Sequence, residues 1–503
     1  MLMQSIKKIQ SSVQSVSLII QLKQQPLTLT LSIVIALSYF LSFLSLTHTG
    51  AHDDQRVLQI VFLLIFGGLI LIKVLRTNYL IGLNEMGLLW LLTPFFLLGA
   101  ISSIRAFSPR YAFYEVASLL MLLILSICVA KEMAQNSAKL LPLVLKICGF
   151  GCMLYAFKVF VVYMSALIVG IQPTVADFAP GFSNYRFLNH AQTIALPLLF
   201  LLSILDKRGD KIKIMWLLIA GFWWTLLFVT AGRGTFFGLM VGCAGAYLLR
   251  QEHARSFCRV MLITGVLGLA INIVFFGLIP ITFGLEPFGE FFHLAQRTAE
   301  NPTSSRLGLW LRAFELIVQH PWLGVGPLHY AHYGIDVQVG AHPHNWMLQI
   351  GAEWGLPALL CLCLVIRLAI LRLLQTAKFI SENDAINHTI LVAWIVIGVA
   401  ILVDGLFSGL IVMPLSQLLI ALYIGCATGW SLSLKSSSMT RFETASKLRR
   451  VIFAVLLLAS MFALMNGVWP EIKGLIGHEV VSEKDIALYN GIYRPRLWLA
   501  GYF

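Results

Sequence analysis

The amino-acid sequence predicts an all-α, polytopic integral membrane protein, a bundle of helices that crosses a bilayer many times. Hydrophobic residues make up 58% of the 503 residues, charged residues only 12%, and the mean hydropathy is +0.84. In soluble domains about 25% of the residues are charged. The apolar residues also form runs of roughly 20, the length that a helix needs to span the hydrocarbon core with every backbone polar group paired internally.

About thirteen apolar runs are long enough to span a membrane, and twelve or fourteen is equally compatible with their soft boundaries. In chain order they cover residues 28–47, 57–75, 84–104, 114–130, 140–168, 190–205, 213–230, 234–250, 259–281, 346–373, 389–408, 411–430 and 451–468. The first run is expected to act as an uncleaved anchor, because no small-residue cleavage site follows it.

The net charge of +13 is concentrated in alternate connections between these runs, such as Lys73 to Arg76, Lys131 to Lys139 and Lys207 to Lys213. This alternation follows the positive-inside rule, which places basic connections in the cytoplasm. The N-terminus is therefore predicted to be cytoplasmic. Because the basic excess is explained by topology, no nucleic-acid partner is expected.

The predicted topology divides the chain into a cytoplasmic segment 1–27, an N-terminal transmembrane bundle 28–281, an exported loop 282–345, a C-terminal transmembrane bundle 346–468 and an exported tail 469–503. The eight cysteines lie in predicted spans, apart from Cys258 on the cytoplasmic side. No disulfide is therefore expected in the exported parts.

The exported loop is too long for a simple turn, which indicates a functional element. Residues 305–317 have apolar side chains at helical spacing, and the helix should stop at His320-Pro321. Such an amphipathic helix is expected to lie on the membrane surface as a lid and to carry Arg306 to a site beneath it.

The segment 341–355 reads Ala-His-Pro-His-Asn-Trp-Met-Leu-Gln-Ile-Gly-Ala-Glu-Trp-Gly. His344 stands at the entrance of a span, and Gln349 and Glu353 follow at four-residue helical spacing. Polar side chains inside a membrane are costly, so they indicate a function or a fixed partner. The alternative is that His342 and His344 lie in the interfacial layer and Glu353 caps a neighbouring helix. A zinc site is weaker, because no third ligand stands at the usual spacing.

Two further polar stretches are predicted on the same exported face. Residues 182–192 hold Arg186, Asn189, His190 and Gln192 just before the sixth span, and Arg233 joins two spans by a tight turn. The alternatives are a capped helix start with an interfacial arginine, and an arginine that only anchors a hairpin.

Residues 344–355 follow the pattern H-N-x-x-L-Q-x-x-x-E-x-G. Arg306 with Trp310 and the stretch His-Pro-Trp-Leu-Gly-Val-Gly at 320–326 precede it. Together these motifs resemble the O-antigen ligase and O-oligosaccharyltransferase superfamily, which includes Wzy-type polymerases. The family places an arginine after serine in a short motif similar to that around Arg233, whereas Gly232 precedes it here. The stretch 185–192 is similar to the pattern of pilin-type O-oligosaccharyltransferases.

The resemblance implies an inverting, metal-independent enzyme of the bacterial inner membrane that takes a glycan from undecaprenyl diphosphate at the periplasmic face. Arginines bind diphosphate bidentately and histidine accepts a proton near neutral pH. The expected roles are diphosphate binding by Arg233, Arg306 and Arg186, proton transfer by His344, and contacts to sugar or acceptor from Asn189, Gln192, His342 and Asn345, with Glu353 orienting His344 or holding a helix partner.

The acceptor remains open between the lipid A core and a pilin or other protein, and a growing glycan would make the protein a polymerase. A polysaccharide or lipid transporter is the alternative from another class, because Lys146, Lys158 and Asp404 could form a path of buried charges. The aromatic and arginine residues at 493–503 are expected to anchor the exported tail at the interface or to dock a partner.

Overall fold

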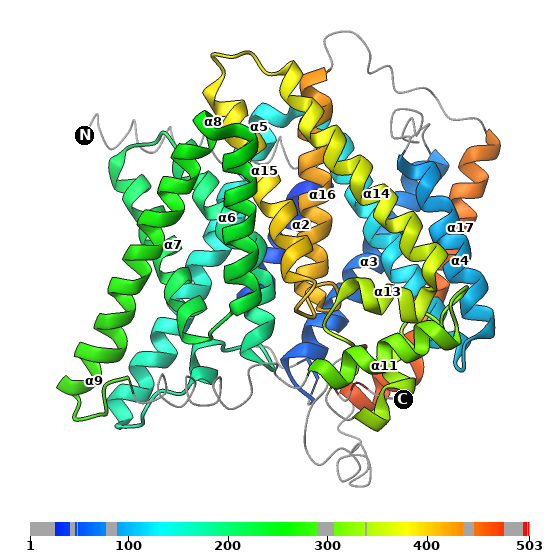
Figure 1. Ribbon diagram of the computed structural model, residues 1–503, viewed down its shortest axis with the longest axis horizontal. Coiled ribbons are helices and arrows are strands. Elements are labelled where there is room, and N and C mark those ends of the chain that lie inside the picture. The colour runs from blue at the N-terminus through cyan, green and yellow to red at the C-terminus, as the bar shows by residue number, and fades with distance from the viewer. Residues whose placement is uncertain are drawn as a thin grey trace.

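The computed structural model describes residues 26–40, 46–47, 49–76, 88–288, 306–337, 340–435, 447–476, 496–499, 501 and 503. Over these residues the regular structure is helical and no strand occurs. Long helices form a bundle, and shorter helices gather at one of its ends (Figure 1). The prediction of an all-α, multi-pass membrane protein is confirmed.

Nine helices in the described part are long and apolar enough to cross a membrane. They are α3 (Ala51–Arg76), α5 (Pro109–Val169), α6 (Tyr185–Leu205), α7 (Asp210–Val229), α8 (Arg233–Ile273, continued by a π-helical turn and α9, Ile279–Thr282), α14 (Leu356–Gln375), α15 (Ala385–Asp404), α16 (Pro414–Lys435) and α17 (Lys447–Ile476). Two shorter apolar helices are α2 (Pro26–Phe40) and α4 (Leu88–Arg105).

The two longest helices each contain a break. The backbone of α5 leaves helical geometry at Asn136, in a polar connection between two predicted spans, and that of α8 at Arg250, where the predicted span 234–250 ends. Counting each broken helix as two and adding the two shorter helices gives thirteen apolar helical segments in the described residues. This is the number that the hydropathy of the sequence predicts.

The predicted tenth span, 346–373, differs from the structure. It is divided into α13 (Trp346–Trp354) and α14 by Gly355, which has φ +86°. A side chain at this position would also collide with the carbonyl of Trp322, because a Cβ atom there would lie 2.3 Å from that oxygen. Glycine is the residue that accepts both conditions. As a result, α13 is a separate helix and α14 alone is long enough to span.

Glycines spaced four residues apart bring neighbouring helices close together. Gly238 and Gly242 of α8 pack on α15, where an added Cβ would lie 2.9 and 2.7 Å from backbone oxygens. Gly425 and Gly429 of α16 pack in the same way on α5. In lipid, helices associate mainly through such close van der Waals packing, because burial of apolar surface between helices gains little over contact with lipid.

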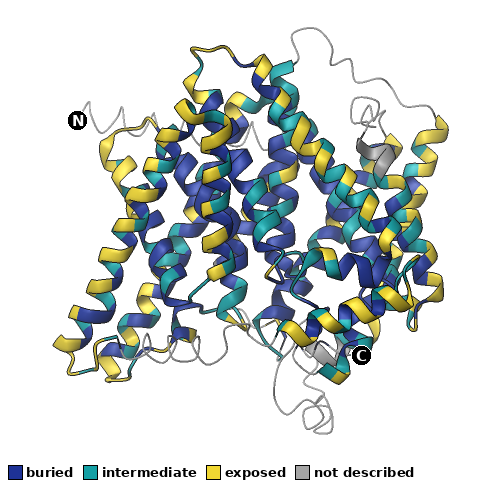
Figure 2. Cartoon of the chain, in the orientation of Figure 1, coloured by how far each residue is buried: buried dark blue, intermediate teal, exposed yellow. Residues whose placement is uncertain are grey.

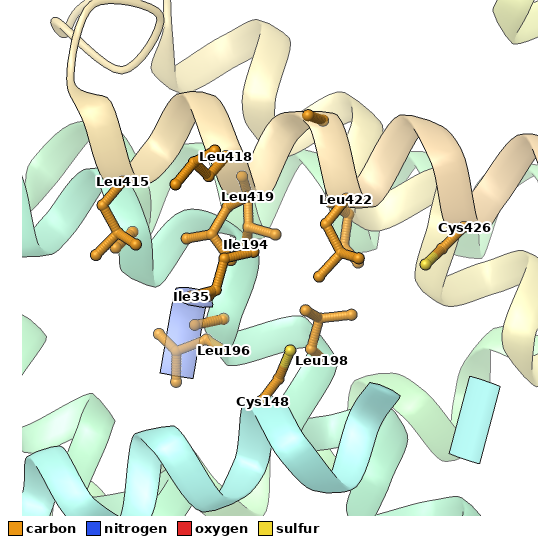
Figure 3. Close-up of a cluster of buried hydrophobic side chains, with 14 of the residues drawn as sticks. Ile35, Cys148, Ile194, Leu196, Leu198, Leu415, Leu418, Leu419, Leu422 and Cys426 are labelled. Carbon is orange, nitrogen blue, oxygen red and sulfur yellow. The ribbon is translucent and has the colours of Figure 1, made fainter. Parts of the chain in front are cut away.

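The interior of the bundle is apolar and is centred on α6. Figure 3 shows side chains of α2, α5, α6 and α16 meeting there, among them Ile35, Cys148, Ile194 and Leu419. In the most apolar stretch of α6, 89% of the residues are buried inside the protein, whereas in that of α14 only 6% are buried. Figure 2 shows the corresponding change from buried residues in the centre to exposed residues on outer helices such as α14 and α17. These exposed apolar faces are suited to contact with lipid.

One end of the bundle, hereafter the site end, carries three short helices: α11 (Arg306–Gln319), α12 (Tyr330–Tyr333) and α13 (Figure 1). The predicted loop helix agrees with α11 to within about two residues. Its buried face packs through Leu309, Ala313 and Leu316, and its exposed side carries Leu307, Leu311, Phe314 and Val318. Residues 289–305 of the predicted loop and 1–25 of the N-terminal segment lie outside the described residues.

Candidate functional site

A polar pocket opens at the site end and holds about 580 Å³ of empty space, including its open mouth. Four elements that are far apart in the sequence form its walls: the start of α6, the turn between α7 and α8, the start of α11 and the end of α15. Its lining residues are Tyr185, Arg186, Asn189, His190, Thr230, Ala231, Gly232, Arg233, Gly234, Thr235, Arg306, Asp404, Phe407 and Ser408. The structure therefore brings together the three arginines that the sequence analysis selected.

The first wall is the start of α6. Asn184 caps this helix, because its side chain accepts a hydrogen bond from the backbone N–H of Arg186 at 2.9 Å. Arg186, Asn189 and His190 then follow at spacings of three and four residues, so they share one face of the helix. Asn189 donates to the Thr230 hydroxyl at 2.7 Å, which ties this wall to the next. Its Oδ1 atom, although buried, has no partner among the described residues.

The second wall is the turn that presents Arg233 as the first residue of α8. Ala231 has φ +46°, the left-handed conformation that reverses the chain in one step. On one side of the arginine, a Cβ at Gly232 would lie 2.7 Å from Nδ2 of Asn189. On the other, a Cβ at Gly234 would lie 2.3 Å from Oδ1 of Asp404. Small residues on both sides let α6 and α15 close around the turn.

Asp404 supplies the negative charge of the pocket. Thr193 donates to its Oδ2 atom at 2.6 Å, and Thr235 lies 3.3 Å from the same atom. Both threonines are also joined to each other at 2.8 Å. This network holds the carboxylate at the pocket wall, where its field favours the charged form of Arg306.

Arg306 enters the pocket from α11, outside the spanning helices. Burial, together with the charges of Arg186 and Arg233, lowers the pKa of its guanidinium to about 10, while the charge of Asp404 opposes this shift. At neutral pH the side chain is still charged. The crowding of three cations around one pocket is therefore unfavourable in the empty protein and would be relieved by a bound anion.

The histidine pair stands next to the pocket, at the start of α13. The side chain of Asn345 caps α13 by accepting hydrogen bonds from the backbone N–H groups of Met347 and Leu348. His344, the residue before Asn345, has a φ of +52°. The ring centroids of His342 and His344 are 4.0 Å apart. His342 is buried and packs against Gly409, the neighbour of the lining residue Ser408.

Helix α11 holds this segment in place. The indole N–H of Trp310 on α11 donates to the carbonyl of Pro343 at 3.0 Å. From the other side, the backbone N–H of Trp346 donates to the carbonyl of Gly405 at 3.0 Å. His344 is thus fixed between α11 and the end of α15, the two elements that bring Arg306 and Asp404 to the pocket.

Both histidines are held in the neutral form. Burial lowers the pKa of His344 well below its ordinary value, and the positive field of Arg306, His190 and Arg186 lowers it further. The pKa of His342 is lowered well below its ordinary value for the same reasons, with His344 as the largest charge contribution. The imidazole of His344 is therefore available as a proton acceptor at neutral pH, although a lowered pKa also makes it a weaker base than a free histidine.

A flat pH profile is the expected consequence. A histidine of ordinary pKa, about 6.5, is roughly one quarter neutral at pH 6 and almost entirely neutral at pH 8. Because the pKa of His344 is lowered, its neutral fraction should stay close to one over this range. The value of kcat/KM for transfer should therefore change by less than about twofold between pH 6 and 8. A fall of fourfold toward pH 6 would mean that a group of ordinary pKa controls the rate.

Five selected residues are not among the lining residues. His342, His344 and Asn345 stand beside the pocket, whereas Gln192 and Glu353 lie away from it. Gln192 is fully buried, accepts from Asn189 at 2.9 Å and donates to the carbonyl of Trp223 at 2.7 Å. It therefore orients Asn189, and the expected contact between Gln192 and a sugar is not supported by this geometry.

Glu353 is the second such residue, and the expectation that it orients His344 directly is wrong. The two residues lie at opposite ends of α13, roughly 13 Å apart at 1.5 Å per residue. The Glu353 carboxylate is completely buried, accepts from the first N–H of α12, at Tyr330, and pairs with Arg496 at 2.7 Å. These contacts agree with the part of the alternative in which Glu353 caps a neighbouring helix.

His190 and Asp404 line the pocket but were not selected from the sequence. His190 stands one residue after Asn189, and its Nδ1 atom is buried with no partner among the described residues. Asp404 is an acidic residue in a predicted span, a feature that by itself indicates function. The sequence analysis therefore placed Asp404 in a possible path of buried charges. Nothing in the sequence shows that Asp404 lies beside Arg306.

A family model described as O-antigen ligase (Wzy_C) matches residues 214–363. The matched region includes Arg233, Arg306, His344 and the whole of α11 and α13, whereas the start of α6 and Asp404 lie outside it. A search of curated proteins finds no match to this chain. The family match confirms the resemblance to the O-antigen ligase superfamily that the motifs indicate.

Proposed function

Because residues 214–363 carry an O-antigen ligase domain, we propose that this multi-pass membrane protein transfers a glycan from undecaprenyl diphosphate to a hydroxyl acceptor. The reaction takes place at the periplasmic face of a bacterial inner membrane, which is where the positive-inside rule puts the site end. The acceptor is the lipid A core or a protein such as a pilin.

The observation that carries this proposal is the convergence of Arg186, Arg233 and Arg306 in one pocket. Undecaprenyl diphosphate leaves as an anion whose charge grows in the transition state. Arginines are permanently charged and bind phosphate oxygens in a planar, bidentate way. Donors fixed in advance where charge develops stabilise the transition state without later reorganisation.

The remaining residues fit the other half of a single displacement. The acceptor oxygen forms a bond to the anomeric carbon while the bond from that carbon to the diphosphate oxygen breaks, and the electron pair leaves with the diphosphate. The acceptor proton passes to neutral His344. Asn189, with its buried Oδ1 atom at the pocket wall, accepts a hydrogen bond from a sugar hydroxyl. Attack from the side opposite to the leaving group inverts the anomeric carbon.

The test uses the purified full chain and a radiolabelled glycan on undecaprenyl diphosphate. Lipid A core and a pilin-type protein are offered in separate reactions. The expected result is labelled, covalently modified acceptor in one of them, together with released undecaprenyl diphosphate. Movement of intact donor across vesicles without a covalent product would overturn the proposal in favour of a transporter, and lengthened donor glycans without acceptor would identify a polymerase.

Transfer is also expected to continue in an excess of EDTA, within about twofold of the untreated rate. The reason is that the arginines already supply the positive charge that a divalent cation gives to the diphosphate in other transferases. The rate is measured before chelation, after chelation and after addition of magnesium. Loss of activity that magnesium restores would contradict the role given to the arginines.

A further inference from the structure

The last described residues of the chain, Arg496–Leu499, Gly501 and Phe503, form a tail segment that is buried at the site end. Arg496, Leu497 and Leu499 are only 2%, 5% and 4% exposed. The sequence analysis expected an exported tail that anchors at the interface or docks a partner. For Arg496, Leu497 and Leu499 the structure shows packing against the rest of the chain in place of interfacial anchoring, because their side chains are enclosed by the protein itself.

The backbone of the tail segment is attached to the start of α3. The N–H of Leu499 donates to Oδ1 of Asp53 at 2.7 Å, and the guanidinium of Arg56 donates to the carbonyl of Arg496 at 3.2 Å. Arg56 also donates to the carbonyl of Val412 in the connection between α15 and α16. The segment therefore has a fixed place against the transmembrane bundle.

Phe503 adds a second attachment. Its ring lies 4.3 Å from that of Tyr111 and 5.1 Å from that of His329, centroid to centroid. Its backbone oxygen lies 2.7 Å from Nδ1 of His332. The tail segment thus connects α3 and α5 to the short helix α12 of the site end.

The side chain of Arg496 crosses to α13. One of its terminal nitrogens lies 2.9 and 2.7 Å from the two carboxylate oxygens of Glu353, and 3.5 Å from Glu115. The amide oxygen of Gln349, in the orientation that pairs acceptor with donor, accepts from both terminal nitrogens at 2.5 and 3.0 Å. Removing one partner of such a buried pair leaves an uncompensated charge, which strongly destabilises the fold.

Gln349 and Glu353 belong to the same nine-residue helix whose first turn follows His344. The N-terminal end of α13 is held by Trp346 and by the contact of Trp310 with Pro343, whereas Arg496 holds its C-terminal half. We propose that Arg496 is a positioning residue, which sets the direction of α13 and thereby places His344 against the pocket. This inference rests on the transferase function proposed above and deepens it.

The expected effect follows from geometry. If α13 tilts when Arg496 is lost, His344 is displaced, although the substitution removes none of the residues that contact His344. A displacement of about 1 Å in a catalytic group can cost as much as 10²-fold in rate. The binding of the donor, by contrast, depends on Arg186, Arg233 and Arg306, which α13 does not carry.

The test compares three purified full-length variants with the wild type. Arg496→Ala removes the positioning side chain, and Arg496→Leu combined with Glu353→Leu replaces the buried pair by apolar side chains. Arg110→Ala is the matched control, because Arg110 makes a double hydrogen bond to Glu471 at the same end of the bundle without touching α13. Melting temperature, kcat and the KM for the lipid-linked donor are measured for each.

We expect Arg496→Ala to lower kcat by about tenfold or more, with a donor KM within about twofold of the wild type. The double variant should regain most of the melting temperature, because the fully buried charge of Glu353 is removed together with its partner, but should keep the low kcat. Arg110→Ala should keep the kcat of the wild type. Recovery of kcat together with melting temperature in the double variant would overturn the inference, because Arg496 would then act only on stability. The double variant also provides the test if Arg496→Ala does not fold.

Amide hydrogen exchange supplies a readout that is independent of activity. In Arg496→Ala, peptides covering residues 340–355 should exchange at least about tenfold faster, whereas those of α15 should be unchanged. Unchanged exchange in 340–355 would remove the positioning role. If the exchange is faster in Arg496→Ala but the wild-type protein itself transfers no glycan, the positioning role is kept and the transferase function is rejected.

Discussion

Replacing Arg306 or Arg233 by lysine should lower glycan transfer by about 10²-fold, although a basic residue remains at each position. Lysine is a point charge and does not reproduce the planar, bidentate contact of a guanidinium with phosphate oxygens. At position 306 there is a second reason. The surroundings that lower the pKa of Arg306 to about 10 would act on a lysine of ordinary pKa about 10.4, so that lysine would be partly neutral.

Arg312→Lys is the matched control for Arg306→Lys. Arg312 lies on the same helix but forms ion pairs with Glu315 and Asp336 at the protein surface. Pairs of this kind contribute little, so the control should transfer glycan at nearly the normal rate. Initial rates with the lipid-linked donor are measured for all three variants. If the lysine variants at 306 and 233 were as active as the control, both arginines would serve only to anchor their helices.

The spanning helices were predictable from the sequence because lipid imposes one condition on every span. Backbone groups must be paired within the helix, so each crossing needs its own apolar run. The breaks at Asn136 and Arg250 were predictable too, since basic connections mark both. The division at Gly355 was not, because it lies inside a continuous apolar run and its cause is the carbonyl of Trp322, more than thirty residues earlier.

The arginines of the site were predictable for a topological reason. Residues in connections on the same side of a membrane lie at a similar depth. The sequence therefore predicts that Arg186, Arg233 and Arg306 share one thin layer, but not that they meet within it. The structure brings them to one pocket. Which side of each helix faces the pocket was not predictable, and this explains why Asn189 lines it while Gln192 turns to Trp223.

The pairing of Glu353 with Arg496 joins residues 143 positions apart and leaves no local pattern. An arginine between aromatic residues in a terminal stretch is typical of interfacial anchoring. The complementary burial of Arg496 and Glu353 becomes visible only in three dimensions. The same holds for Asp404, whose partners Thr193 and Thr235 belong to two other helices.

His344→Ala should abolish nearly all transfer, an effect of about 10²-fold or more on kcat. The protein should still insert and bind the donor, because the three arginines remain in place. His320→Ala is the matched control, since His320 is an exposed histidine at the end of α11. Donor binding and kcat are measured separately, so that loss of chemistry is not confused with loss of affinity. Near-normal turnover would remove His344 from the reaction.

Chemical rescue decides whether the missing imidazole acts as a base or only fills space. Added imidazole diffuses into the cavity left by His344→Ala and can accept the acceptor proton there, so it should raise the residual rate of this variant but not that of Arg306→Lys. Free imidazole titrates with a pKa near 7, whereas that of His344 is held well below its ordinary value. The rescued rate should therefore fall as the pH drops from 8 to 6, while the wild-type rate stays flat. A rescued reaction with no pH dependence would show that imidazole restores packing rather than proton transfer.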